Sequence, residues 1–496
     1  MVTRLTGLSS GLDIDSWVTD LMKAERTKVD TQYQKKQTLE WKRDNYRSIN
    51  TKLLALRTAS SDLQLQGTFL SKTAASSDSS LLTVTAGTSA VEANYTVKIN
   101  SMASSATKSS TAAIGSTSDK TTLASQLGLS GNVTFTLEGK NGSKDFTFDT
   151  SNTSMTQMVN QINSANLGIK ASYDSTSDRF FLMTTDSGST SEIHVKADAE
   201  NFLTSKLKLS LTVGSDEANA VKGTDASIDF NDATGLTFSS NQFTVNGLTI
   251  NLKQASGSTT IKVENDTEAQ IKKIKTFVEA YNNAMDTMST ELSAERDRDY
   301  TPLTDSQKED MSEAEITNWE TKAKTGLLKG DSLTMSVYNS LRSISYTQVE
   351  GLSGNYKTLG SVGISTASYS DKGKLYIDED KLRTALTADP EGVMNLFTKS
   401  STIDSQKGLA VKLYNSVSNG ITRISSQAGS SSDYVDTSLI GKNLTDVSEL
   451  ISDLEDKLDD TEERYYRKFS AMEEAIQKFN SQSQYLSSMF SSSSNS

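Results

Sequence analysis

Apolar side chains recur at helical spacing near the start of the chain. From Asp13 to about Leu65 there is no proline, and a seam of apolar positions advances by three, four, three and seven residues: Tyr46, Ile49, Leu53, Leu56 and Leu63. This spacing places the apolar side chains on one face of a helix. The pattern therefore predicts one long helix whose apolar seam needs a partner.

The pattern changes to short alternating runs between about Thr73 and Val263. Turn-forming Gly, Asn, Asp and Ser residues separate these runs, which is typical of strands and hairpins. One apolar helical face interrupts them, so we expect an α+β region. The predicted elements are strands within Leu81 to Gly87 and Phe243 to Leu252, tight turns at Asn141-Gly142 and Asn246-Gly247, and a helix from Met155 to Leu167.

Helical periodicity returns at Asp266. An apolar stripe there consists of Ile271, Ile274, Phe277, Val278 and Tyr281. Farther along, Gly-containing runs predict short strands between Gly351 and Leu375, and helical turns follow around Pro390. We expect a helix-rich domain with a small β part.

The last part of the chain has the clearest coiled-coil pattern. Its seam positions advance by three and four residues, apart from one stutter at Thr461, Tyr465 and Phe469. The serine content predicts disorder for Ser487 to Ser496. The seam residues are Leu444, Val447, Ile451, Leu454, Leu458, Thr461, Tyr465, Phe469, Met472, Ile476, Phe479, Ser483, Leu486 and Phe490.

The two helical ends carry opposite charge. Residues 20–57 contain ten Lys or Arg against five Asp or Glu, a difference of +5, whereas residues 446–474 contain four against eleven, a difference of −7. We infer that the two ends pair, within one subunit or between neighbours. Two independently solvated charged faces are the alternative, because an exposed ion pair contributes only about 0.2–1 kcal/mol.

These patterns predict a multidomain α+β protein. Helical coiled-coil termini and a helical middle domain enclose an inserted β-rich head of two domains. The expected parts are an N-terminal helical leg (1–70), a discontinuous β-rich middle domain (71–104 and 216–264), a nested α+β tip domain (105–215), a helix-rich domain (265–440) and a C-terminal coiled-coil leg (441–496).

Composition and charge exclude several function classes. The 496 residues have a formal net charge of −12, which disfavours nucleic acid as a partner. The opening residues lack the apolar run of a cleavable signal peptide, and no window resembles a membrane span, so we expect no membrane insertion. With no cysteine and one histidine, thiolate metal sites, cysteine nucleophiles and disulfides are excluded, and Ser-His dyads nearly so.

That single histidine, His194, lies in the alternating segment SEIHVKAD. Without a second histidine or a cysteine, an exposed or half-buried strand position is expected in preference to a metal or acid-base role. We therefore predict no enzyme activity, no cofactor and no metal site.

Several segments together resemble one known family. GLSSGLDIDSWVTDLMKAER at Gly7 to Arg26 is similar to the amino-terminal region of the flagellar hook-associated protein 2 family, the bacterial filament cap proteins. The stretch from Phe146 to Leu182 resembles a motif shared with flagellins and hook proteins. YTPLTDSQKEDMSEAEITNWETKAKTGLLKGD and the stretch from Arg464 to Phe490 resemble the carboxy-terminal cap-protein region.

The resemblance implies a non-enzymatic assembly factor at the tip of the bacterial flagellar filament, outside the cell. Its implied partners are further copies of itself in a ring, expected to be a pentamer, as well as flagellin, hook–filament junction proteins and a type III export chaperone. It would leave the cell through the flagellar type III apparatus, prevent loss of flagellin, and promote flagellin folding and insertion.

The residues expected to contact the filament or other subunits are the seam positions of both legs. They are Tyr46, Ile49, Leu53, Leu56, Leu444, Val447, Ile451, Leu454, Leu458, Tyr465, Phe469, Met472, Ile476, Phe479 and Leu486. The alternative function is a surface adhesin that binds mucus or host glycans through its Ser- and Thr-rich β head.

Overall fold

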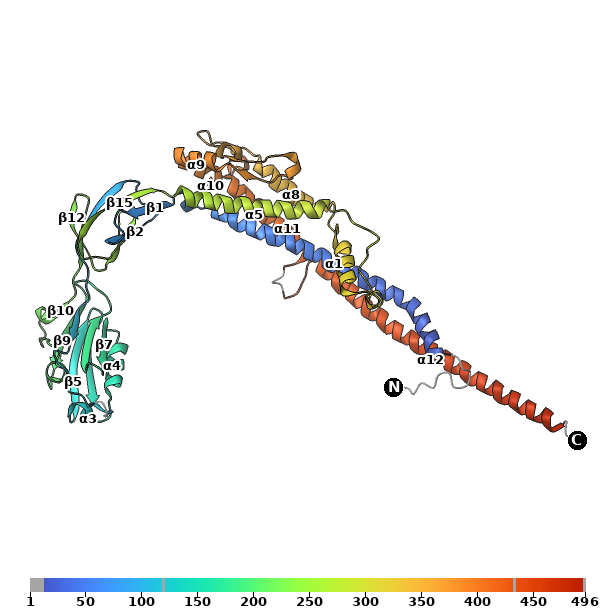
Figure 1. The fold of residues 1–496 in the computed structure, drawn as a ribbon, viewed down its shortest axis with the longest axis horizontal. Coiled ribbons are helices and arrows are strands. Elements are labelled where there is room, and N and C mark those ends of the chain that lie inside the picture. The colour runs from blue at the N-terminus through green and yellow to red at the C-terminus, as the bar shows by residue number, and fades with distance from the viewer. Residues whose placement is uncertain (1–12, 118–120, 431–433, 494–496) are drawn as a thin grey trace. The chain divides into compact units, whose positions relative to one another are not determined.

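The computed structural model describes residues 13–117, 121–430 and 434–493. The chain divides into two compact units, Met1–Phe69 with Glu268–Ser496 and Leu70–Thr267 (Figure 1). The mixed α+β architecture predicted from the sequence is confirmed. The opening motif at Gly7 to Leu12 lies outside the described residues.

The first unit is built around long helices. α1 (Ile14–Asp62) packs against α11 (Leu409–Ala428) and α12 (Leu439–Ser493), and α11 also packs against α8 (Ser332–Ser345). α12 continues through Ser493, so the disorder predicted from Ser487 onward is wrong up to that residue. The remaining α-helices of this unit are α2 (Gln66–Phe69), α5 (Thr267–Ser293), α6 (Asp305–Glu309), α7 (Glu313–Lys324), α9 (Glu379–Ala388) and α10 (Pro390–Thr398). The strands β16 (Ile364–Ser365) and β17 (Tyr376–Ile377) pair as an antiparallel two-stranded ribbon.

Local sequence sets several of these helix starts. The carboxylate of Asp13 accepts a hydrogen bond from the backbone N–H of Ser16 at 3.0 Å and caps α1. Ser312 and Glu315 form a reciprocal capping box at the start of α7, and Asp389 caps α10 in front of Pro390. These side chains satisfy amide groups that have no partner inside the helix.

The second unit contains two hydrophobic cores. One core lies between a five-stranded sheet of order β1-β15-β3-β11-β12 and a three-stranded sheet of order β13-β14-β2. All pairings in these sheets are antiparallel. The strands are β1 (Lys72–Ser76), β2 (Leu82–Ala86), β3 (Asn94–Ser101), β11 (Ala226–Phe230), β12 (Ala233–Phe238), β13 (Gln242–Val245), β14 (Leu248–Leu252) and β15 (Gly257–Asn265).

The other core, between Ala106 and Leu209, is inserted within the first in sequence. It joins a four-stranded sheet of order β10-β9-β5-β6, a three-stranded sheet of order β4-β8-β7, and the helices α3 (Leu123–Leu127) and α4 (Met155–Ser164). The strands are β4 (Thr107–Ser109), β5 (Asn132–Gly139), β6 (Gly142–Asp149), β7 (Ile169–Asp174), β8 (Arg179–Thr184), β9 (Glu192–Asp198) and β10 (Val221–Lys222).

Two predicted turns have different outcomes. Asn246 and Gly247 both adopt positive φ between the paired residues Val245 and Leu248, as a two-residue hairpin turn requires. In the other hairpin Gly139 pairs with Gly142, so the turn residues are Lys140 and Asn141, one position earlier than predicted.

Candidate assembly interface

The N-terminal seam residues lie inside the helical unit. Tyr46, Ile49, Leu53 and Leu56 are buried in a core that they share with residues of α5, α8 and α11. Helix α11 packs closely against α8 at Gly420, where an added Cβ would lie 3.0 Å from the side chain of Val337. These four residues thus pack within their own chain, and the contact with the filament or other subunits expected of them stays a prediction.

Tyr46 also supplies a polar link within this core. Its hydroxyl donates a 2.6 Å hydrogen bond to the carboxylate of Asp331, which caps α8. Burial, helped by this hydrogen bond, strongly raises the pKa of Tyr46. The hydroxyl therefore stays protonated and keeps its role as a donor.

The burial of the seam side chains decreases along α12. Val447 and Ile451 are buried, and Phe479 and Leu486 are exposed by 69% and 53%. The side chain of Phe490 lies outside the described residues. The half-buried positions are Leu444, Leu454, Leu458, Tyr465, Phe469, Met472 and Ile476.

Helices α1 and α12 pair in antiparallel fashion within one chain. Arg47 forms a 2.9 Å ion pair with Asp436, the Tyr33 hydroxyl donates to Glu455 at 2.8 Å, and the Trp17 ring meets that of Phe469 edge-on with centroids 6.0 Å apart. The pairing of the two chain ends predicted from the sequence is confirmed. Because Trp17 lies close to the described start of α1, the last turns of α12 extend beyond that start (Figure 1).

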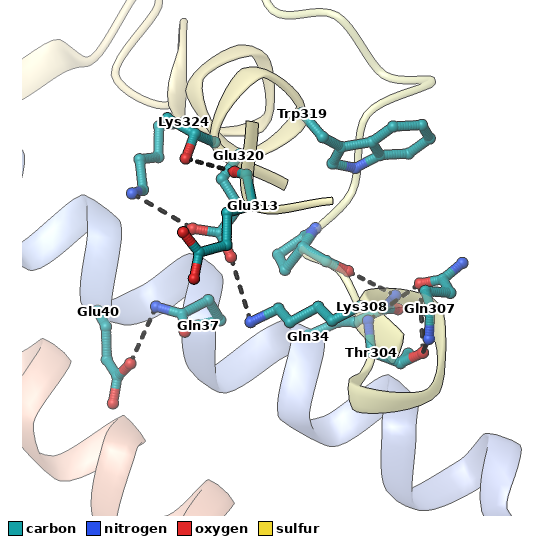
Figure 2. A network of polar contacts seen from close by, with 12 residues as sticks. Gln34, Gln37, Glu40, Thr304, Gln307, Lys308, Glu313, Trp319, Glu320 and Lys324 are labelled. Carbon is teal, nitrogen blue, oxygen red and sulfur yellow. Dashed lines mark hydrogen bonds and ion pairs between the residues drawn. The ribbon is translucent and has the colours of Figure 1, made fainter. Parts of the chain in front are cut away.

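The segment between α5 and α8, here called the covering segment, covers the other side of α1. Residues 294–330, with α6 and α7, pack on Trp41 through Ala323 and Leu327, and the Gln34 side chain donates to the carbonyl of Pro302 at 2.8 Å. Figure 2 shows this segment held by Glu320, which pairs with Lys308 at 3.2 Å and with Lys324 at 3.6 Å. Tyr300 and Trp319 pack against the same small cluster, whose few apolar positions form no periodic pattern in the sequence.

His194 is fully buried in β9, so the exposed or half-buried position predicted for it is wrong. Its Nδ1 lies 3.2 Å from Glu138 and its Nε2 lies 2.7 Å from the carbonyl oxygen of Gly214. Glu217 brings a third possible metal ligand within 4.8 Å of the others. However, Lys196 pairs with Glu138 at 2.7 Å, and this bond lowers the pKa of Glu138. Glu138 therefore already has a cation of the chain itself as its partner.

Among the described residues, none of the helices is both long and apolar enough to span a bilayer.

Comparisons with known proteins agree with one another. Family models described as Flagellar hook-associated protein 2 C-terminus, Flagellar hook-associated protein 2 N-terminus and Flagellin hook IN motif match residues 223–481, 10–106 and 134–186. Flagellar hook-associated protein 2 of Halalkalibacterium halodurans is 32% identical over 98% of this chain and 99% of its own length. The Escherichia coli K12 protein of the same name is 26% identical over 99% of this chain and 98% of its own length.

A solved structure has a similar fold. The D1-D2-D3 domains of the flagellar cap protein FliD from Escherichia coli align with 81% of this chain and 99% of their own length, with a TM-score of 0.56 and 21% identity.

Proposed function

The chain belongs to the flagellar hook-associated protein 2 family, and from this premise we propose that it caps the tip of the bacterial flagellar filament. In this role it retains exported flagellin and promotes its folding and insertion. It acts by assembly and not by catalysis. The similar fold of FliD from Escherichia coli, a flagellar cap protein, supports this role.

The observation that carries the proposal is the exposed end of α12. Phe479 and Leu486 continue the seam to which Val447 and Ile451 belong, yet they are exposed whereas Val447 and Ile451 are buried. Burying one such side chain is worth about 1.5–3 kcal/mol. A helix that presents an apolar stripe of this kind gains stability by packing against helices of other molecules. We propose that these helices belong to the filament.

Self-association completes the proposed role. We propose a ring of this chain at the extracellular filament tip, with five subunits as the resemblance implies. Its other proposed partners are flagellin, the hook–filament junction proteins and an export chaperone, and its route is the flagellar type III apparatus. A ring on a helical lattice leaves one gap at a time, and many weak leg contacts permit stepping as each flagellin enters.

A second candidate function rests on the outer face of the β4-β8-β7 sheet. Phe181 and Met183 are exposed there by 36% and 49%, beside Thr107, Lys108 and Ser109. These residues line an open hollow of about 520 Å³. An aromatic ring among hydroxyl groups suits a sugar, so we propose glycan adhesion as the alternative function of the β head.

Deletion of the gene tests both proposals. If the protein is the cap, the deleted strain releases unpolymerised flagellin into the medium and lacks filaments, and the intact gene restores them whereas a copy truncated after Gly441 does not. Normal filaments with lost surface attachment would instead favour adhesion and contradict the cap role.

A further inference from the structure

A row of five carboxylates runs along one face of α12. Asp446, Glu449, Asp453, Asp456 and Asp460, here called the acidic stripe, are all exposed. Each follows a seam residue by two positions: Leu444, Val447, Ile451, Leu454 and Leu458. Two residues correspond to a rotation of about 200° in an α-helix. The acidic stripe therefore faces away from α1.

These carboxylates are not neutralised within the chain. Across the described residues, none of the five accepts a hydrogen bond or forms an ion pair. Like charges spaced by three and four residues on one helix face destabilise the helix by a few tenths of a kcal/mol per pair. An opposite charge from outside the chain would remove this repulsion.

A basic hollow lies on the other side of α1. Lys42 of α1 and Arg296, Arg298 and Lys329 of the covering segment line a space of about 650 Å³, here called the basic hollow. Lys329 is paired with Glu295. Within the described chain, the other three cations have neither an ion-pair nor a hydrogen-bond partner. In a chain of net charge −12, such a group of cations suits an anionic partner.

The two features lie at the same level along the helix pair. The contacts of Tyr33 with Glu455 and of Arg47 with Asp436 bracket Lys42 on α1 and the first half of the acidic stripe on α12. Helix α1 lies between the covering segment and α12 (Figure 2). One copy of the chain therefore presents the acidic stripe and the basic hollow on opposite sides, at similar positions along the axis of the α1–α12 pair.

We propose that the acidic stripe of one copy docks against the basic hollow of a second copy. Such a contact is heterologous, since two different surfaces meet, and repetition of it closes a ring when the rotation between copies allows closure. The proposal names the contact that holds the ring suggested under the proposed function. It rests on that function for its biological meaning but is testable on purified protein alone.

Charge reversal tests the contact. Asp453→Lys/Asp456→Lys reverses part of the acidic stripe, and Arg296→Glu/Arg298→Glu reverses part of the basic hollow. All four side chains are exposed, so the fold is retained. Sedimentation or light scattering measures the dissociation. Each double variant should dissociate at an about tenfold lower salt concentration than wild type or, on dilution at fixed salt, already at an about tenfold higher protein concentration. The chain with all four changes should recover the wild-type mass.

A matched control changes net charge as the stripe variant does, but elsewhere. Asp232→Lys/Glu309→Lys replaces two exposed carboxylates that lie outside both surfaces, and it should leave the mass unchanged. A wild-type mass for either reversal variant, a failure of the fourfold variant to recover, or a wild-type chain that stays monomeric would overturn the proposal. None of these results bears on whether the protein caps filaments in cells, which the gene deletion reports separately.

Crosslinking gives a second readout, because the chain has no native cysteine. Arg298→Cys/Asp456→Cys treated with a short bis-maleimide should give a ladder of covalent oligomers on a denaturing gel, and each single-cysteine variant should give only the uncrosslinked chain. Dimers from a single-cysteine variant without a ladder from the pair would contradict the head-to-tail arrangement.

Discussion

Tyr46 and Asp331 join two helices through one pair of polar atoms. Their hydrogen bond of 2.6 Å links α1 to the cap of α8 at a partly buried position. A buried hydrogen bond to a charged group contributes about 1.5–3 kcal/mol. The tyrosine is therefore more than an apolar seam residue, which its spacing in the sequence does not reveal.

Tyr46→Phe should lower the free energy of unfolding of the helical unit by about 1.5–3 kcal/mol, because the partly buried carboxylate of Asp331 loses a hydrogen-bond donor. Urea denaturation followed by circular dichroism measures this change. Tyr434→Phe is the control, since Tyr434 is fully exposed and should change stability little. Equal effects of the two substitutions would show that the hydrogen bond contributes nothing.

Gly326 is a second residue whose identity matters, because the structure leaves no room there for a Cβ atom. It has a φ of +73°, and an added Cβ would lie 2.6 Å from the backbone nitrogen of Arg296. Gly326→Ala should therefore destabilise the covering segment by about 1–3 kcal/mol. Gly330→Ala is the control, because Gly330 has a φ of +65° with open space around it and should lose only about 1 kcal/mol.

Hydrogen exchange of the amides between residues 294 and 330 measures both effects. Faster exchange in Gly326→Ala than in Gly330→Ala is expected. The reverse order would show that the close approach is not needed.

At the scale of elements, α12 combines two roles in one periodic pattern. Its seam is buried at Val447 and Ile451, half-buried along α1, and exposed from Phe479. The first part stabilises the chain and the last part is available to other molecules. A heptad pattern predicts that a helix needs partners but does not identify them.

Ile451→Ala and Leu486→Ala separate these roles. Ile451 is 5% exposed, so its truncation should cost about 2–4 kcal/mol of unfolding free energy, whereas Leu486→Ala should cost almost none. Thermal unfolding of the two variants beside wild type measures the difference. A loss of stability in Leu486→Ala as large as that in Ile451→Ala would mean that the exposed end is packed in the free protein.

The sequence predicted the type of most elements, and tertiary packing explains its errors. Alternation and helical periodicity correctly placed α1, α4, α12 and the hairpin at Asn246. They could not show that Leu53 lies beside Gly420 of α11, because any apolar partner satisfies the same spacing. The burial of His194 was missed because its partners, Glu138 and the carbonyl of Gly214, come from other segments of the chain.

At the scale of the whole molecule, the two chain ends and the middle helices form one unit, and the β-rich segment forms another. This arrangement places the first and last helices side by side although the sequence separates them by almost its full length. The division of the chain into five domains stays a prediction. The helical unit contains the surfaces proposed for assembly, and the β unit contains the hollow proposed for glycans.

The most direct test of the capping account uses the deletion strain complemented with Phe479→Asp/Leu486→Asp. Both side chains are exposed, so the variant should fold and be secreted like wild type, which circular dichroism and immunoblotting of the medium check. The account predicts that filaments stay absent and that soluble flagellin accumulates in the medium, as in the deletion itself. Filaments of wild-type length from this variant would contradict the claim that the exposed end of α12 holds the cap on the filament.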